Sequence, residues 1–305
     1  MTRWQRSLEI AKASWAVLKS DRQLIWLPVL SFLATLVVAG VIAGLVFLTR
    51  THDASGHTQI GAAGYVVAIV GYFAVAFVGV YFLGALVAAA DEVLRGGHPA
   101  VGAALQAANQ RIHRLLPWAI VTATVTLILN ALERRGGWVG RIVGSLLGLA
   151  WSVLTFLTVP IIMLENVGPG DALKRSRDLF KKTWGENLML NFGLGALGFL
   201  AMLPAFAIVA IGAATRVTAI IVVTVAIAVA WFAVAQAVIA ALSGIFRAAL
   251  YRYAADGVVP VPFQGTPLPQ AFAPRPAQEG GGGGRGFGGF GGFGGPGGFS
   301  GGGMR

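Results

Sequence analysis

The stretch that decides the fold is Leu24–Leu48, LIWLPVLSFLATLVVAGVIAGLVFL, which lies within 27 uncharged residues between Arg22 and Arg50. A helix rises about 1.5 Å per residue, so this stretch is long enough to cross roughly 30 Å of hydrocarbon in a bilayer. It is also longer than the apolar core of a secretory signal, which has about 7–15 residues. We therefore predict a retained transmembrane helix.

The composition of the whole chain agrees with a membrane protein. Of 305 residues, 56% are hydrophobic and 11% are charged, whereas a soluble domain has about 25% charged residues. The chain has no cysteine, which excludes disulfides, thiolate nucleophiles and cysteine-ligated metals. The net charge is +11. In so apolar a chain this excess indicates loops that face anionic lipid, and we expect no nucleic-acid partner.

Five further apolar stretches follow the first, each bounded by charged residues. We predict an all-α, polytopic transmembrane helical bundle in residues 1–255. The third stretch has only 18 residues, close to the minimum for a crossing, so a re-entrant pair formed by the third and fourth stretches stays open as an alternative. The six predicted spans are residues 24–48, 62–90, 115–132, 142–164, 188–214 and 217–246.

The distribution of Lys and Arg predicts the orientation of these spans. If the N-terminus is cytoplasmic, the cytoplasmic segments hold 18 basic residues and the outer loops hold five. Cytoplasmic loops carry the excess of Lys and Arg, so we expect both termini to be cytoplasmic. The loop Glu133–Arg141 is the discordant piece, because it places three of those five on the outer side. The Ala-, Gly- and Val-rich composition favours a multi-pass protein of a bacterial plasma membrane.

An internal repeat predicts how the spans are organised. Arg6–Trp15, RSLEIAKASW, aligns without gaps on Arg175–Trp184, RSRDLFKKTW. Both copies have residues at the spacing of one predicted apolar helix face, and a looser copy spans residues 104–115. The predicted faces consist of Trp4, Leu8, Ala11, Trp15 and Leu18 in the first copy and of Leu173, Ser176, Phe180 and Trp184 in the second. Each copy precedes a pair of spans. The fold is therefore predicted to contain three pseudo-repeats of an amphipathic helix plus a transmembrane hairpin, at residues 3–90, 99–164 and 170–250.

These amphipathic helices combine tryptophan with Lys and Arg, as helices at the headgroup boundary do. We predict that they lie in the inner-leaflet interface, with anionic lipids as their partners. The alternative is that they are positively charged loops whose only role is to set topology. The predicted membrane-interface residues are Trp4, Arg6, Lys12, Trp15, Lys174, Arg175, Lys181, Lys182 and Trp184.

One segment carries a family resemblance. Pro160–Ser176, PIIMLENVGPGDALKRS, followed by KKTWG at 181–185, resembles uncharacterised bacterial six-span membrane proteins. These are similar in layout to the membrane domain attached to some glycerophosphodiester phosphodiesterases. The resemblance covers about residues 3–255 and implies a helical membrane bundle. It implies no catalytic residue.

The predicted spans contain no Asp, Glu, Lys, Arg or His, and ion-coupled transporters usually need such groups within the membrane. Among their polar residues, Asn130 and Gln236 could line a cavity or could join helices by hydrogen bonds. Gly144 and Gly148, four residues apart, belong to a GxxxG pattern that favours close helix crossing. We therefore assign these four residues to a cavity or to helix packing.

No established catalytic, cofactor or metal motif is present. His52, Asp53 and His57 match no zinc-site spacing and are better explained as a solvated loop. The signatures H-E-x-x-H and G-x-S-x-G are absent. We expect no catalytic residue, no cofactor and no metal.

The C-terminal residues 256–305 differ in composition from the rest of the chain. They are Pro-rich and then Gly- and Phe-rich, and such a segment cannot bury enough surface to fold. We predict a disordered cytoplasmic tail. It is either dispensable or, through its phenylalanines, a site of self-association or of contact with a protein partner.

The sequence is compatible with three functions. The first is a non-enzymatic membrane-organising or accessory protein. The second is a channel or facilitator for a small neutral or lipidic solute, which requires polar span residues to converge on one axis. The third, an intramembrane enzyme, requires Glu133, Glu165 or His98 to meet a nucleophile in a cleft.

Overall fold

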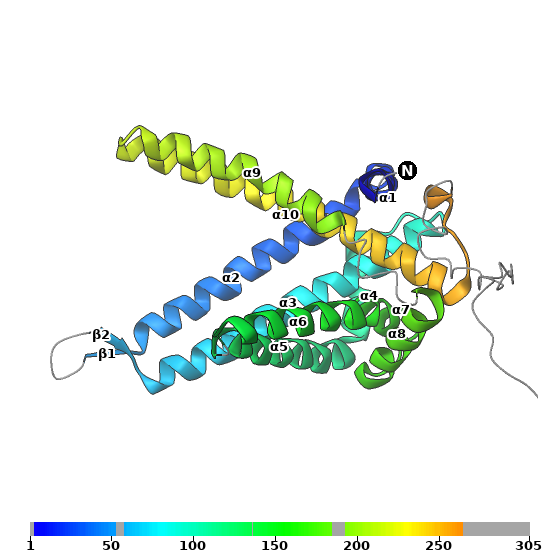
Figure 1. Cartoon of the computed structure of the whole chain (residues 1–305), viewed down its shortest axis with the longest axis horizontal. Coiled ribbons are helices and arrows are strands. Elements are labelled where there is room, and N and C mark those ends of the chain that lie inside the picture. Colours follow the sequence, from blue (N-terminus) through cyan, green and yellow to red (C-terminus); the bar gives the residue numbers. More distant parts are fainter. Residues whose placement is uncertain (1–2, 53–57, 136, 185–192, 265–305) are drawn as a thin grey trace, which may run out of the picture. The chain divides into compact units, whose positions relative to one another are not determined.

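The computed structural model describes residues 3–52, 58–135, 137–184 and 193–264. The predicted all-α class is confirmed: apart from a two-stranded ribbon, the regular structure in these ranges is helical (Figure 1). The predicted disordered tail lies outside the described residues from 265 onward. Residues 256–264, which we had assigned to that tail, are described and form part of the helical unit.

The first predicted span forms α2 (Trp26–Leu48), which is preceded by α1 (Arg3–Ser20) and the 3₁₀ helix η1 (Arg22–Ile25). Asp21 caps η1 by accepting a hydrogen bond from the backbone N–H of Gln23. A ribbon of β1 (Arg50–His52) and β2 (Thr58–Ile60), paired antiparallel, joins α2 to α3 (Ala62–Leu94). The first hairpin is thus formed by α2 and α3.

The second hairpin is formed by α5 and a broken helix. After α4 (Val101–Gln110), α5 covers Ile112–Arg135, and α6 (Gly137–Thr155) is separated from α7 (Thr158–Leu164) by two residues. Pro160 accounts for the break, because it has no N–H to donate to residue 156 and its ring would clash with that carbonyl in a continuous helix. The predicted span 142–164 is therefore two helices.

The third hairpin is formed by α9 (Gly193–Ala214) and α10 (Thr218–Asp256), which follow α8 (Pro169–Trp184) and run side by side (Figure 1). α10 continues ten residues beyond the predicted end of the sixth span. Gly257, with φ of +70°, ends it in the left-handed conformation that glycine adopts readily. The 3₁₀ helix η3 (Val261–Phe263) then contacts α1.

Among the described residues, five helical segments are long and apolar enough to cross a membrane: Arg22–Leu48, Ala62–Leu94, Ile112–Arg134, Gly137–Leu164 and Thr218–Asp256. They correspond to five of the six predicted spans. The remaining span, predicted at 188–214, begins among residues outside the described part and continues as α9. The sixth crossing and the three-unit organisation stay predictions.

The buried core lies toward the ends of the helices and not along the middle of the spans. It collects the last turns of α3, most of α7, the C-terminal part of α10, and residues of α1 and η1. By contrast, the most apolar window of α2 has no buried residue, and that of α10 is 6% buried. Apolar surface of this kind is what a helix presents to lipid. The end with the buried core is the predicted cytoplasmic end.

Candidate functional site

The candidate site is built on Asp91, where the sequence had placed the end of the second span. The helix α3 continues past it to Leu94, and the Asp91 carboxylate is paired on both sides. Its Oδ2 lies 2.9 Å from Nη2 of Arg95, one turn later, and its Oδ1 lies 2.5 Å from Nε of Arg252 in α10. The side chains of Asp91 and Arg252 are only 8% and 14% exposed. This buried ion pair joins α3 to α10.

A second group of contacts ties the same end of α10 to the α7–α8 connection. The Tyr251 hydroxyl donates to Glu165 Oε1 at 3.1 Å, and Arg175 Nε donates to the same oxygen at 3.3 Å. Tyr251 and Arg252 are neighbours, so two consecutive residues of α10 contact two different elements. We call the following residues the polar collar: Asp91, Arg95, Glu165, Arg175, Tyr251 and Arg252.

Two more cations lie near the collar. Arg114 of α5 donates to Oδ1 of Asn166, a residue held at a positive φ of 56° between α7 and α8. Arg247 places its guanidinium carbon 4.5 Å from the centre of the Phe156 ring, at the break between α6 and α7. Its Nε is buried and has no hydrogen-bond partner among the described residues. The collar region is thus basic as well as ion-paired.

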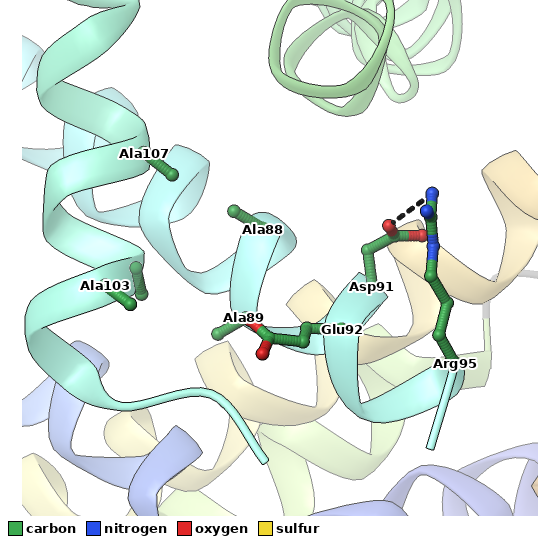
Figure 2. A pocket seen from close by; sticks show the side chains of 8 residues that line it. Ala88, Ala89, Asp91, Glu92, Arg95, Ala103 and Ala107 are labelled. Atoms are coloured by element: carbon green, nitrogen blue, oxygen red, sulfur yellow. Dashed lines mark ion pairs between the residues drawn. The ribbon is translucent and has the colours of Figure 1, made fainter. Parts of the chain in front are cut away.

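A pocket of about 250 Å³ lies beside the collar, between the end of α3 and α4. Figure 2 shows the Asp91–Arg95 pair on one side of α3 and the Glu92 side chain on the side that faces Ala103 and Ala107. Within the described part of the chain, Glu92 forms no ion pair, whereas Asp91 forms two. The pocket therefore combines alanine walls with the Asp91–Arg95 pair and with one carboxylate, that of Glu92, that has no ion pair of its own among the described residues.

In α1, the predicted interface residues lie on the side away from the core. Ile10, Ala13 and Val17 are buried, whereas Lys12 and Trp15 are exposed. The ammonium group of Lys19 lies 5.9 Å from the centre of the Trp15 ring. The side chains of Trp4 and Arg6 lie outside the described part. Of the apolar face predicted in α1, Leu18 is buried, whereas Trp15 is exposed. The face that packs runs through Ile10 and Val17, to one side of the predicted one.

In α8, the apolar face packs against the protein. Ala172, Ser176 and Leu179 are buried, and the Ser176 hydroxyl donates to the Leu154 carbonyl of α6 at 2.6 Å. Of the apolar face predicted through Leu173, Ser176 and Phe180, Ser176 is thus buried, whereas Leu173 and Phe180 are only partly buried. The basic side chains of Lys174, Arg175 and Lys181 are exposed, and those of Lys182 and Trp184 lie outside the described part.

The polar span residues do not converge. Asn130 in α5 and Gln236 in α10 are both exposed, and neither forms a hydrogen bond with the described residues. The hydroxyls of Thr122 and Thr126 bond to carbonyls of their own helix, α5. These residues therefore do not line a common polar path in the part of the chain that is described.

The two predicted packing glycines differ in their surroundings. Gly144 of α6 is buried against the Glu133 side chain of α5, so that a Cβ at this position would overlap it. One turn earlier, a Cβ at Gly140 would lie 2.8 Å from the Leu132 carbonyl oxygen. Around Gly148 there is open space within 4 Å. The close crossing of α5 and α6 thus uses the first two glycines of the pattern.

This contrast gives a matched pair of substitutions. Gly144→Leu is expected to lower the free energy of unfolding by about 1–3 kcal/mol, because the added side chain forces α5 and α6 apart. Gly148→Leu adds the same atoms where there is room and is expected to have a much smaller effect. Thermal unfolding in detergent measures both. Equal destabilisation by the two variants would contradict the close crossing at Gly144.

The three acids and bases considered for an enzyme do not meet. Glu165 is engaged in the collar, Glu133 packs at Gly144, and His98 Nδ1 lies 3.7 Å from Asp21 Oδ2. Among the described residues, no group of three or more His, Cys, Asp or Glu could hold a metal ion. Of the loop residues considered for a metal, Asp53 and His57 lie outside the described part.

Sequence reasoning missed Asp91 and Arg252 as partners because 161 residues separate them. A signal was present at Asp91, which directly follows three alanines, where a neighbouring helix is able to approach closely. Glu92 comes next in the sequence, where the pattern indicated only the end of a span.

Comparison with known proteins gives one match. A family described as a family of unknown function (DUF6159) matches residues 62–261, which include α3 to α10 and the whole collar. No curated protein and no solved structure shows a significant match to the chain.

Proposed function

The chain belongs to DUF6159, a family of unknown function, and from its geometry we propose that it is a non-enzymatic integral membrane protein that organises the inner leaflet. In this proposal both termini are cytoplasmic, the membrane is a bacterial plasma membrane, and six spans are arranged in three repeats. The likeness in layout to the membrane domain of some glycerophosphodiester phosphodiesterases belongs to the same proposal.

The observation that carries this proposal is the separation of two regions. The ends of the helices are packed and ion-paired through the polar collar, whereas the most apolar windows of α2, α3 and α10 are 0–6% buried. A rigid end that presents exposed Lys and Arg suits contact with anionic headgroups, each basic residue contributing about 1 kcal/mol near the surface. The long apolar windows suit contact with lipid tails.

The alternative function, a channel or facilitator for a small neutral or lipidic solute, requires a polar path through the spans. The exposed positions of Asn130 and Gln236, on helices that belong to different hairpins, favour the organising role over this alternative.

A reconstitution experiment tests the proposed function. The full chain is placed in vesicles that contain a minority of fluorescent anionic lipid, and self-quenching reports how strongly the protein gathers that lipid. We expect quenching with the full chain and none with protein-free vesicles. Uptake of a neutral solute by the same vesicles, without lipid gathering, would instead favour the facilitator.

The basic face of α8 gives a local prediction. In nanodiscs, we expect the amides of α8 to exchange more slowly when anionic lipid is present than in zwitterionic lipid alone. Replacing Lys174, Lys181 and Lys182 by glutamine should remove that difference, because each charge contributes about 1 kcal/mol of attraction. Arg175 is kept, since it bonds to Glu165. Hydrogen–deuterium exchange of α8 is the measurement.

The matched control replaces three exposed basic residues predicted to lie on the outer side: Arg134, Arg141 and Arg216. This variant loses the same charge but should keep the lipid-dependent protection of α8. An identical loss of protection in both variants would show that net charge, and not the α8 surface, is responsible.

A possible partner of the tail is tested by co-purification in mild detergent with and without residues 265–305. The cut is placed after Gln264 because Phe263 is fully buried and belongs to the packed unit.

A further inference from the structure

The pocket between α3 and α4 contains the carboxylate of Glu92, which takes no part in the polar collar. It is lined by the last two turns of α3, by Arg95, whose guanidinium is paired with Asp91, and by alanines of α4, and it has a volume of about 250 Å³. Asp91 is fully engaged by two arginines. Glu92, its neighbour, has no cationic partner among the described residues and extends toward the α4 side (Figure 2).

The Glu92 side chain lies against the turn that follows α3. Gly96 has a φ of +86°, and the backbone N–H of Gly97 donates to the Glu92 carbonyl at 2.9 Å. A Cβ on Gly97 would lie 2.8 Å from Glu92 Cγ and 3.4 Å from its Oε1. The absence of a side chain at residue 97 is therefore what allows the carboxylate to lie against the turn.

The chemistry of the pocket selects a class of ligand. A carboxylate accepts hydrogen bonds from an ammonium group, and these charge-assisted bonds are among the stronger ones in proteins. The methyl groups of Ala103, Ala104 and Ala107 offer an apolar wall for a short carbon stem. The Glu92 carboxylate beside this wall thus suits a primary ammonium on a stem of a few carbons.

The position of the pocket along α3 suggests where such a group comes from. The pocket lies at the end of the apolar segment Ala62–Leu94, where charged residues begin. If α3 crosses the bilayer, this is the depth of the headgroups. An aminophospholipid of the ethanolamine type carries the required ammonium group, and a free small amine in the cytoplasm carries the same chemistry.

We propose that Glu92 and the alanine wall of α4 form a binding site for a small primary ammonium group, supplied by an aminophospholipid headgroup or by a free amine. The site differs from the anionic-lipid surface of α8 in the sign of its charge and in its place on the protein. It does not depend on the proposed organising function.

The experiment uses the purified full chain and has two arms. In the first, native mass spectrometry counts phosphatidylethanolamine retained by the chain, with phosphatidylcholine, whose ammonium is blocked by methyl groups, as the comparison lipid. In the second, saturation-transfer NMR detects free ethanolamine, with ethylene glycol as the uncharged comparison. Retention in the first arm alone identifies the lipid as the source, and a signal in the second shows that the free amine suffices.

Three variants connect either signal to the pocket. Glu92→Gln removes the charge and should weaken binding about tenfold, the loss expected for one charge-assisted hydrogen bond. Gly97→Ala keeps the charge but displaces the Glu92 side chain, and it should weaken binding as well. Asp178→Asn, an exposed carboxylate of α8 paired with Arg177, is the control and should bind like the unmodified chain.

The proposal is overturned if neither ligand binds in preference to its comparison molecule, or if Glu92→Gln binds as the unmodified chain does. Thermal unfolding of each variant checks that the fold is kept, and Glu92 is exposed, so its substitution should leave the unfolding temperature almost unchanged.

Discussion

Replacement of Asp91 by alanine is expected to lower the free energy of unfolding by about 3–5 kcal/mol, the cost of leaving a buried ion without its partner. The side chain of Arg252 is 14% exposed, and once the carboxylate is removed its Nε loses the acceptor it has in the structure. Unfolding in detergent, followed by circular dichroism, measures the loss. α10 should separate from α3 before the other helices unfold.

The two arginines that contact Asp91 provide graded controls. Arg95 is 64% exposed, so Arg95→Ala should cost less than about 1 kcal/mol, as exposed ion pairs do. Arg252→Ala should lie between the two, because Arg95 still neutralises the carboxylate that remains. If all three variants were equally stable, the buried pair would not be what joins α3 to α10.

Replacement of Phe263 by alanine is expected to have an effect of similar size, about 3–5 kcal/mol, through the cavity it leaves. Phe263 is 0% exposed and is among the largest fully buried side chains of the described residues. It lies in η3, which packs on α1, so the variant should also free the segment that follows α10. Thermal unfolding measures the stability, and limited proteolysis of residues 257–264 measures the release.

The neighbouring Val261 is the matched control. It lies in the same 3₁₀ helix but is 74% exposed, and Val261→Ala should change stability by less than about 0.5 kcal/mol. Equal proteolysis of the two variants would mean that burial of Phe263 does not hold the segment.

Phe263 and Asp91 are two residues whose burial was not predicted from the sequence. Phe263 stands in a Pro-rich stretch with no helical or strand periodicity, so the composition placed it in the tail. Asp91 follows an apolar run, and a charged residue in that position predicts the end of a membrane span. Both assignments depend on local pattern, whereas the burial of each residue depends on segments far away in the chain.

In the amphipathic helices too, the local sequence pattern did not predict which residues are buried. Their existence and their basic faces were predicted, and α1 and α8 form as expected. In α8 the predicted face was right at Ser176, which is buried, but Ala172 and Leu179 are buried where Leu173 and Phe180 were expected. A step of one residue is only about 100° on a helix, and the neighbouring helices decide which side is covered.

The long apolar run Leu24–Leu48 and those that follow it determined, without any structure, that this chain forms helices long and apolar enough to cross a membrane. Length and hydrophobicity suffice for that, because lipid requires every backbone group to be satisfied within its own segment. Only the tertiary structure decided that α3 and α10 extend past their spans, that Asp91 meets Arg252, and that Glu92 is left facing a pocket. Those features depend on which distant side chains come close enough to compensate a charge.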